Sequence, residues 1–333
     1  MKSVDDKLTC CCGSHKCEGR CSCGHAGHHN SEELKEECER RIDECSSEQV
    51  STNEKILSLS YSEKIKMIKN HENLDVFVDD KDECIRAAVA EQGYGLDKLI
   101  SDRRSNVRAA VARQGYGLDR LINDMDIEVI KAVAEQGYAL DKLINYKRWS
   151  IRMTVAEQGY GLDRLVNDEN DLVRATVARQ GYGLEKLVND SRYVVRLNVA
   201  RQGYGLDKLV NDPIPSVREA VAEQGYGLNK LINDENYFVR VAVAEQGYGL
   251  DKLINDENWF VRFAVAKQGY GLDKLINDKD FRVRIAVAEQ GYGLDKLVYD
   301  RVFAVSSAVR RQGYRIIDEN IEKELKEFDS IED

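Results

Sequence analysis

Prolines, histidines and long apolar runs are all scarce in this chain of 333 residues. Its only prolines are Pro213 and Pro215, and no histidine follows His71. No run approaches the ~20 apolar residues that a membrane helix needs. No glycine-rich phosphate loop precedes a strand pattern, and no set of polar residues suited to catalysis converges in the repeats. We therefore expect neither a membrane protein nor an enzyme, and no small-molecule partner.

A basic excess is also lacking. The formal net charge is −10 and the pI is near 5.3, which argues against general binding to nucleic acid or to an anionic membrane. The opening residues, Met1–Asp6, do not have the pattern of a signal peptide. We therefore expect a cytoplasmic protein.

What the chain has in abundance is one 22-residue segment, represented here by Asp256–Asn277, which recurs with small changes. Its Gln-Gly-Tyr signature appears eleven times, from Gln92 to Gln312. A repeat this short cannot close its own hydrophobic core, so each copy must pack against the next. The sequence therefore predicts a solenoid of about eleven repeats.

Each repeat reads as a longer helix followed by a shorter one. In the longer helix, small or apolar residues fall at i, i+3 and i+4 of one face: Val261, Ala264 and Val265. Asp256 is the expected N-cap. The copy that contains Pro213 and Pro215 supports this interpretation, because proline is tolerated in the first helical turn.

The end of the longer helix is predicted at Gly269, since glycine adopts the left-handed C′ conformation at little steric cost. Leu272, Leu275 and Ile276 then predict a short second helix, which could be 3₁₀ in character. The predicted fold class is therefore all-α, an α-solenoid of two-helix repeats.

Several positions hardly change between copies, and we interpret them as core or ladder positions that fill the same space in every repeat. In the representative copy they are Val261, Val265, Gln268, Gly269, Tyr270, Leu272 and Leu275. The glutamines are expected to be buried and to bond to one another or to a backbone group of the next repeat, because an unpaired buried amide costs roughly 1–3 kcal/mol.

An aspartate and an arginine also recur, and the exceptions predict how they pair. The arginine becomes Ile130 in one copy, and the aspartate becomes Tyr146 in the next. If each aspartate paired with the arginine six residues later, Asp124 and Arg152 would both lack partners. Pairing each arginine with the aspartate sixteen residues downstream places Ile130 opposite Tyr146 and leaves no charge unpaired. The predicted ladder includes Arg86 with Asp102, Arg108 with Asp124, Arg152 with Asp168, and Arg262 with Asp278.

The unit Asp-x5-Arg-x-Ala-Val-Ala, followed by a turn and Leu-x2-Leu, resembles the leucine-rich repeat variant family, and its Asp/Arg spacing is similar to that of HEAT repeats. The resemblance covers residues from about 74 to 314. It implies a right-handed superhelix of alternating α- and 3₁₀-helices. The chain departs from the usual pattern by its Gln-Gly-Tyr-Gly turn and its 22-residue period.

Residues 1–29 form a segment of different composition, which predicts a metal site. The candidate ligands are Cys10, Cys11, Cys12, Cys17, Cys21, Cys23 and His25. In a reducing compartment such a cluster binds metal more readily than it forms disulfides, and its donors suit zinc or an iron–sulfur cluster. The family resemblance implies a cysteine-rich iron–sulfur module before the repeats. The spacings match neither a zinc ribbon nor a ferredoxin motif, and a flexible thiol-rich tail is the alternative.

The remaining boundaries follow from changes in composition. Residues 30–53 read as a helix and a linker, and residues 54–79 as a degenerate capping repeat in which Lys64 stands at the ladder arginine position and pairs with Asp80. Residues 80–315 hold the full repeats. Residues 316–333 are predicted to form an acidic C-terminal capping helix.

One column of positions varies strongly between copies and is the candidate binding face. In the representative copy it consists of Trp259, Phe263 and Lys267, at i, i+4 and i+8 of one helix face. Its aromatic members elsewhere include Trp149, Tyr193, Tyr237 and Phe281. A core position would not alternate between glutamate and tryptophan, so the column predicts a protein interface. The alternative is that these rings pack locally against neighbouring helices.

Three functions remain open from the sequence. The leading prediction is a protein-binding scaffold with an N-terminal metal site. The second is an iron–sulfur redox or electron-transfer protein that docks through its repeats. The third is a HEAT-like nucleic-acid binder, for which the basic pairs Arg103-Arg104 and Lys147-Arg148 would have to line a groove.

Overall fold

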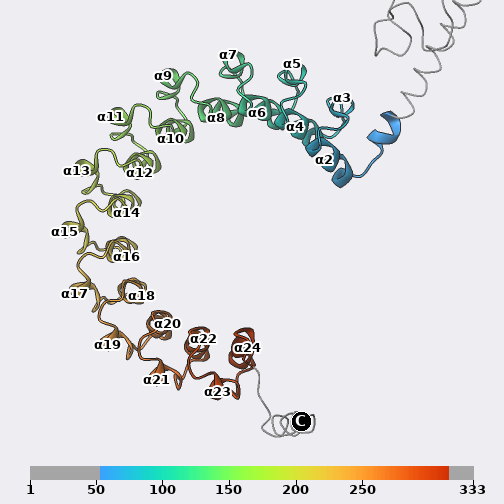
Figure 1. The fold of residues 1–333 in the computed structure, drawn as a ribbon. Coiled ribbons are helices and arrows are strands. Elements are labelled where there is room, and N and C mark those ends of the chain that lie inside the picture. The colour runs from blue at the N-terminus through green and yellow to red at the C-terminus, as the bar shows by residue number, and fades with distance from the viewer. Residues whose placement is uncertain (1–52, 315–333) are drawn as a thin grey trace, which may run out of the picture. The chain divides into compact units, whose positions relative to one another are not determined.

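The computed structural model describes residues 53–314, which divide into two compact units between Ala139 and Leu140. All regular structure in this part of the chain is helical, and helices of nine residues alternate with helices of four at a 22-residue spacing (Figure 1). The predicted all-α solenoid of two-helix repeats is confirmed.

In the first unit, each long helix packs against the next one along the chain (Figure 1). The long helices are α2 (Tyr61–Lys69), α4 (Glu83–Glu91), α6 (Ser105–Arg113) and α8 (Ile127–Glu135). The short helices between them are α3 (Leu74–Phe77), α5 (Leu96–Leu99) and α7 (Leu118–Leu121).

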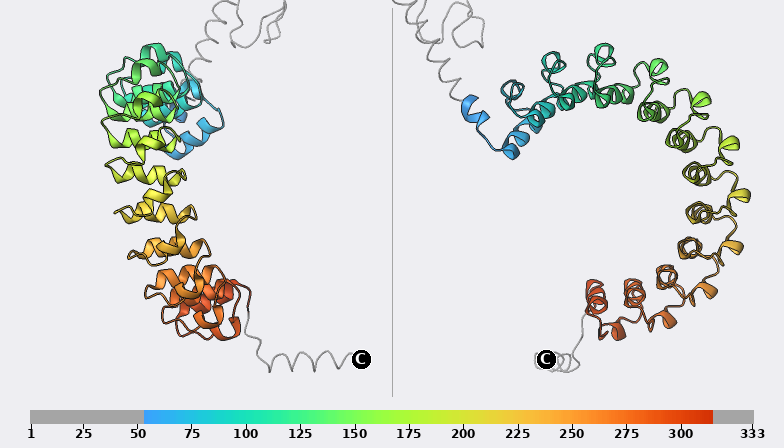
Figure 2. Two further views of the ribbon diagram at one scale, coloured as in Figure 1. Left: turned by 90° about the vertical axis from the view of Figure 1, so that its left-hand side faces the viewer. Right: turned by 180° about the vertical axis from the view of Figure 1, so that it is seen from behind.

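In the second unit, the long helices form an inner row and the short helices an outer row of a curved array (Figure 1 and Figure 2). The long helices are α10 (Trp149–Glu157), α12 (Asp171–Arg179), α14 (Tyr193–Arg201), α16 (Pro215–Glu223), α18 (Tyr237–Glu245), α20 (Trp259–Lys267), α22 (Phe281–Glu289) and α24 (Phe303–Arg311). The short helices are α9 (Leu140–Leu143), α11 (Leu162–Leu165), α13 (Leu184–Leu187), α15 (Leu206–Leu209), α17 (Leu228–Leu231), α19 (Leu250–Leu253), α21 (Leu272–Leu275) and α23 (Leu294–Leu297).

The core of each repeat is built from small aliphatic side chains. Val261 and Val265 of α20 are fully buried, and Leu275 of α21 is buried beneath the same layer. Full burial of such a side chain contributes about 1.5–3 kcal/mol relative to exposure, so stacking of consecutive repeats supplies the main stabilisation.

A Schellman motif ends most of the long helices at the predicted glycine. In α20 the N–H of Gly269, at φ 73°, donates to the Ala266 carbonyl at 2.9 Å, and the N–H of Tyr270 donates to the Val265 carbonyl at 3.4 Å. The following short helix, α21, is an α-helical turn, since the N–H of Leu275 donates to the Gly271 carbonyl four residues earlier at 3.0 Å. The expected 3₁₀ character is therefore wrong for this helix.

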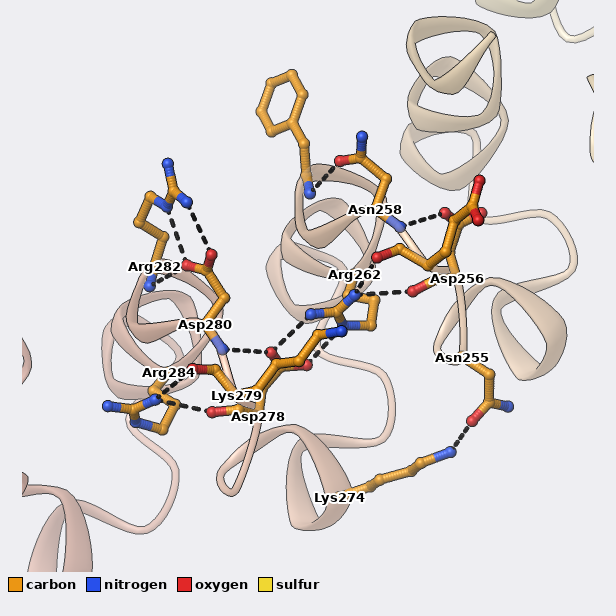
Figure 3. Close-up of polar contacts among 12 residues, drawn as sticks. Asn255, Asp256, Asn258, Arg262, Lys274, Asp278, Lys279, Asp280, Arg282 and Arg284 are labelled. Atoms are coloured by element: carbon orange, nitrogen blue, oxygen red, sulfur yellow. Dashed lines mark hydrogen bonds and ion pairs between the residues drawn. The ribbon is translucent and has the colours of Figure 1, made fainter. Parts of the chain in front are cut away.

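The expected N-cap at Asp256 is also wrong. The N-cap of α20 is Asn258, whose side chain accepts a hydrogen bond from the N–H of Phe260 at 2.8 Å (Figure 3). The carboxylate of Asp256 instead accepts from the N–H of Asn258 at 2.9 Å. In the copy with two prolines, Pro215 is the first residue of α16 and Pro213 lies before the helix. Only Pro215 therefore falls in the first helical turn. Asp256 is displaced from the cap because its carboxylate is committed to the ion-pair ladder.

The ladder forms with the predicted sixteen-residue spacing. Arg262 donates from Nε to Asp278 Oδ2 at 2.6 Å and from Nη2 to Asp278 Oδ1 at 2.8 Å (Figure 3). Its Nη1 donates to the Asp256 carbonyl at 2.8 Å, so the guanidinium also ties down the loop before its own helix. The same bidentate geometry recurs in Arg86–Asp102, Arg108–Asp124, Arg152–Asp168, Arg174–Asp190, Arg196–Asp212, Arg218–Asp234, Arg240–Asp256 and Arg284–Asp300.

In the degenerate repeat predicted for residues 54–79, the ladder pair and the turn are present with substituted residues. Lys64 takes the arginine position and pairs with Asp80 at 2.7 Å. His71 and Asn73 occupy the two glycine positions of the turn and keep its left-handed conformation, with φ of 59° and 53°. At the opposite end of the described chain, Ser306 of α24 stands at the arginine position and bonds to the Phe303 carbonyl of its own helix.

Three of the recurrent positions that we interpreted as core or ladder positions are exposed: Gln268, Gly269 and Tyr270. Gln268 lies at the C-cap of α20, and its Nε2 donates to the Glu245 carbonyl of α18 at 3.2 Å. The glutamine therefore bonds to a backbone group of the neighbouring repeat, which is one of the two partners predicted for it. It does so without being buried. Tyr270, which follows the end of α20, is 42% exposed.

Candidate partner-binding face

The variable column lies on the long helices beside the core and the ladder. On α20, Val261 and Arg262 are buried, whereas Trp259 and Phe263 are half-buried and Lys267 is exposed. The column thus provides side chains that neither fill the core nor pair in the ladder. It reaches solvent in part, and this is the arrangement that an interface requires.

The rings of α18 and α20 form one aromatic cluster. Tyr237 and Phe238 have ring centroids 4.2 Å apart, and Phe238 meets Phe260 edge-on at 6.2 Å. Trp259 lies 6.3 Å from Phe263 with steeply inclined planes. The separations of the Phe238–Phe260 and Trp259–Phe263 pairs fall in the range in which aromatic pairs attract one another beyond their burial. The side chains are therefore held in a defined arrangement while Phe238 remains 43% exposed.

The cluster extends to α22 through a cation. The Arg282 guanidinium lies 3.5 Å from the ring centroid of Trp259 and 5.5 Å from that of Phe281. Asp280 pairs with Arg282 at 2.7 Å and orients it (Figure 3). Stacking of a guanidinium on tryptophan contributes about 0.5–1 kcal/mol at an exposed site. We call the set Tyr237, Phe238, Trp259, Phe260, Phe263 and Phe281, with Arg282 stacked on it, the aromatic patch.

Both open interpretations of the column receive support from this geometry. The rings of α18 and α20 pack against one another, as the local-packing alternative predicts. Phe281 nevertheless remains 37% exposed. Trp149 on α10 and Tyr193 on α14 are 37% and 49% exposed. Local packing therefore organises the patch without sealing it from solvent.

Three members of the patch were missed by the sequence interpretation: Phe238, Phe260 and Arg282. They follow the first column position by one residue, a place held by Ser150 and Ser216 in other copies. That contrast between serine and phenylalanine was the available signal. A column defined only by positions i, i+4 and i+8 leaves out the residue after the first position.

The predicted metal ligands lie outside the described residues. Cys10, Cys11, Cys12, Cys17, Cys21, Cys23 and His25 all fall within residues 1–52. Between residues 53 and 314, no group of three or more His, Cys, Asp or Glu side chains is arranged to hold a metal ion. The predicted C-terminal capping helix, residues 316–333, also falls outside the described range.

The two basic pairs lie in different units. In the first unit, Arg104 pairs with Glu83 at 2.7 Å, so part of the positive charge is neutralised within the protein. In the second unit, Lys147 and Arg148 are exposed before α10, and the Lys147 carbonyl accepts from Arg152 at 3.0 Å. The described residues therefore supply no observation that favours a phosphate-binding groove.

Within residues 53–314, every helix is too short or too polar to cross a bilayer. A scan against protein-family models and a search of curated proteins both find no match to the chain, so the resemblance to leucine-rich repeat variants rests on the repeat pattern alone.

Proposed function

We propose that this chain is a protein-binding repeat scaffold whose second unit recognises a protein partner through the aromatic patch. The observation that supports the proposal is the patch itself, in which rings fixed by mutual packing remain partly open to solvent. Tryptophan and tyrosine in such settings supply much of the binding energy of protein interfaces. In this proposal the repeats have no catalytic role.

The position of the patch on the array also supports the proposal. The long helices of the second unit form the inner row of a curved array (Figure 1). Curved solenoids use extended concave surfaces of this kind for binding. The ladder and the core hold the helices in register, so the patch is presented as a preorganised surface and little ordering of side chains opposes binding.

The test is affinity capture from the native host, with the intact chain compared to a variant carrying Trp259→Ala and Tyr237→Ala. We expect the intact chain to retain a specific partner and the variant to lose it. A matched control carries Tyr248→Ala and Tyr270→Ala, which removes two aromatic rings from the same repeats at sites that are 42% exposed but outside the patch. A partner held equally by the patch variant would contradict the proposal.

The proposal includes a metal site in residues 1–29, because six cysteines and His25 form a donor set suited to zinc or to an iron–sulfur cluster. Bound zinc would stabilise the segment, whereas an iron–sulfur cluster would supply electron transfer and make the repeats a docking arm. A brown purified protein that absorbs in the visible range favours the cluster. A colourless protein that releases zinc on thiol modification favours the structural site.

We also propose membership of the leucine-rich repeat variant family, with its right-handed superhelix and a cytoplasmic location. The repeat carries the Asp-x5-Arg-x-Ala-Val-Ala unit followed by Leu-x2-Leu, which is what supports this assignment. Iron in the purified native protein, in stoichiometric amount, would strengthen the assignment, because the family resemblance implies that module.

A further inference from the structure

A carboxylate interrupts the apolar column of the second unit. Glu219 on α16 occupies the position that Leu197 fills on α14 and Val241 fills on α18, and α16 packs between these two helices. Glu219 is half-buried. A charged group among aliphatic neighbours loses hydration, so its presence in this column needs an explanation beyond packing.

The charges around Glu219 are mostly of the same sign. Burial raises the pKa of Glu219, Glu223 and Glu245 raise it further by repulsion, and Arg201 opposes them. Elsewhere in this unit the acids at the ends of the long helices are paired, as in Arg179–Glu157 at 3.0 Å and Lys267–Glu289 at 3.1 Å.

Within residues 53–314, none of Glu219, Glu223 and Glu245 belongs to an ion pair of 4.0 Å or less. These three carboxylates therefore form a local negative excess, and among the charges that act on Glu219 only that of Arg201 is positive. An incoming cation would relieve the repulsion among the carboxylates and replace part of the hydration that Glu219 has lost.

The acidic group adjoins the aromatic patch. Glu219 lies on α16, and the patch begins with Tyr237 on α18, the next long helix. Packed helices are about 8–10 Å apart, so the three intervals from α16 to α22 cover roughly 25–30 Å. An extended peptide rises about 3.3 Å per residue, so about eight or nine residues would cover this surface.

We propose that this surface binds a peptide segment of a partner protein that carries a lysine or arginine beside aromatic or aliphatic side chains. The carboxylates of Glu219, Glu223 and Glu245 receive the cation, and the aromatic patch receives the apolar side chains. This inference rests on the proposed function and specifies its partner. The acidic group also disfavours segments rich in aspartate or glutamate, and it repels phosphate.

The test is selection of peptides from a random 12-residue display library against the full-length chain. We expect the enriched peptides to carry lysine or arginine within a few positions of aromatic or aliphatic residues. The affinity of a synthetic enriched peptide should fall about tenfold with Glu219→Gln and more with Glu219→Arg, and it should weaken as salt is raised. A peptide with its cation changed to glutamate should recover binding to the Glu219→Arg variant.

Glu185→Gln on α13 is the matched control, because it removes one exposed carboxylate from the outer row and should leave the affinity unchanged. The far-UV circular dichroism spectrum checks that each variant is folded. Absence of enrichment, enrichment without cations, or an affinity unaffected by Glu219→Gln would overturn the inference.

The two proposals fail in different ways. If Trp259→Ala weakens peptide binding while Glu219→Gln does not, the aromatic patch binds protein but the cation site is wrong. If the native partner is captured equally well by the Trp259→Ala, Tyr237→Ala variant, the proposed function itself is wrong.

Discussion

The first unit and the second unit have the same framework but different variable columns. In the three full repeats of the first unit, the first two column positions hold mostly small or charged residues, with Ile127 as the exception: Glu83 with Ala87, Ser105 with Ala109, and Ile127 with Lys131. In the second unit it contains mostly aromatic and aliphatic residues, including Tyr237, Trp259 and Phe263. The ladder geometry is the same in both, with Arg–Asp distances of 2.6–2.7 Å. The column can therefore change without altering the framework.

The physical reason is that framework and column use different atoms. Arg262 directs Nε and Nη2 to Asp278 and Nη1 to a backbone carbonyl, so it needs nothing from the column. Val261 and Val265 are buried in α20, which packs against α18 and α22. This separation allows the column to stay polar in one unit and to become apolar in the other while the same framework is kept.

The largest expected effect is acid unfolding of both units. Hydrogen bonds from Arg108 and Arg284 hold the pKa values of Asp124 and Asp300 below the ordinary aspartate value. For a lowered folded-state pKa, the stabilisation is complete above the ordinary pKa of about 3.9 and is lost as the pH falls through the lowered value. We expect helical circular dichroism to persist from neutral pH to about 4 and to fall below that.

Asp124 lies in the first unit and Asp300 in the second, so both units should lose protection from amide hydrogen exchange over the same pH range. Loss of protection in one unit alone would show that the ladders do not contribute equally. High salt serves as the control, because it should affect these shielded pairs less than exposed ones.

The next largest effect is expected from removing one ladder carboxylate. Asp278→Ala leaves the Arg262 guanidinium, which is only 7% exposed, without its anion, and we expect a loss of about 3–5 kcal/mol in unfolding free energy. Asp124→Ala should cost a similar amount in the first unit. Because repeat arrays need not unfold in one step, amide exchange of the flanking helices should be measured beside urea unfolding.

A double variant separates charge from packing in this prediction. Arg262→Ile with Asp278→Tyr copies the side chains that Ile130 and Tyr146 provide naturally, and it removes both charges together. We expect it to be more stable than Asp278→Ala alone. A double variant that is less stable than the single one would show that the arginine's backbone contacts, and not its ion pair, dominate.

A smaller effect is expected from alanine at the glycines that begin the short helices. Gly271 has φ 59°, and a Cβ there would lie 2.2 Å from Ile254 Cδ1. The left-handed conformation alone costs about 1–2 kcal/mol for a non-glycine residue, and the close approach adds to it. Gly117→Ala in the first unit should cost about as much, since its Cβ would lie 2.1 Å from Ile100 Cδ1.

Gly269→Ala is the matched control for that prediction. Its φ is 73°, but the nearest atom to the added Cβ is Gln290 Oε1 at 4.0 Å. It should therefore show the conformational cost without the clash. Equal losses for Gly269→Ala and Gly271→Ala, in urea unfolding, would mean that Ile254 moves aside at no cost.

The register of the framework was predictable from the sequence because the repeat contains its own exceptions. Ile130 and Tyr146 break the ladder in successive copies, and only the sixteen-residue pairing leaves no charge alone. The spacing of the valines predicts which helix face is buried, and Gly269 predicts where the long helix ends. These features follow from local rules that act within one or two neighbouring repeats.

Other features could not be predicted because recurrence does not distinguish one physical cause from another. Gln268 recurs because it bonds to the end of a neighbouring helix, and the sequence pattern does not distinguish this exposed position from a buried one. Asp256 and Asn258 are both good N-cap residues, and only the ladder geometry decides between them. Phe260 joins the patch through contacts with rings of α18, which a column read along one helix does not reveal.

The smallest expected effect concerns Ala139, which replaces glycine in the last repeat of the first unit. Ala139 keeps the left-handed conformation with φ 51°, and Ile122, at the position equivalent to the buried Ile100, is only half-buried. Ala139→Gly should relieve the strained φ and give room to Ile122. Part of the gain is offset by greater freedom of the unfolded chain, so we expect a stabilisation of roughly 0.5–1 kcal/mol in urea unfolding of the first unit.

Ala132→Gly within α8 is the control and should destabilise by about 1 kcal/mol. A stability unchanged or lowered by Ala139→Gly would show that the alanine is accommodated without strain, and the first unit would then tolerate at this turn what we expect the second unit to resist at Gly271.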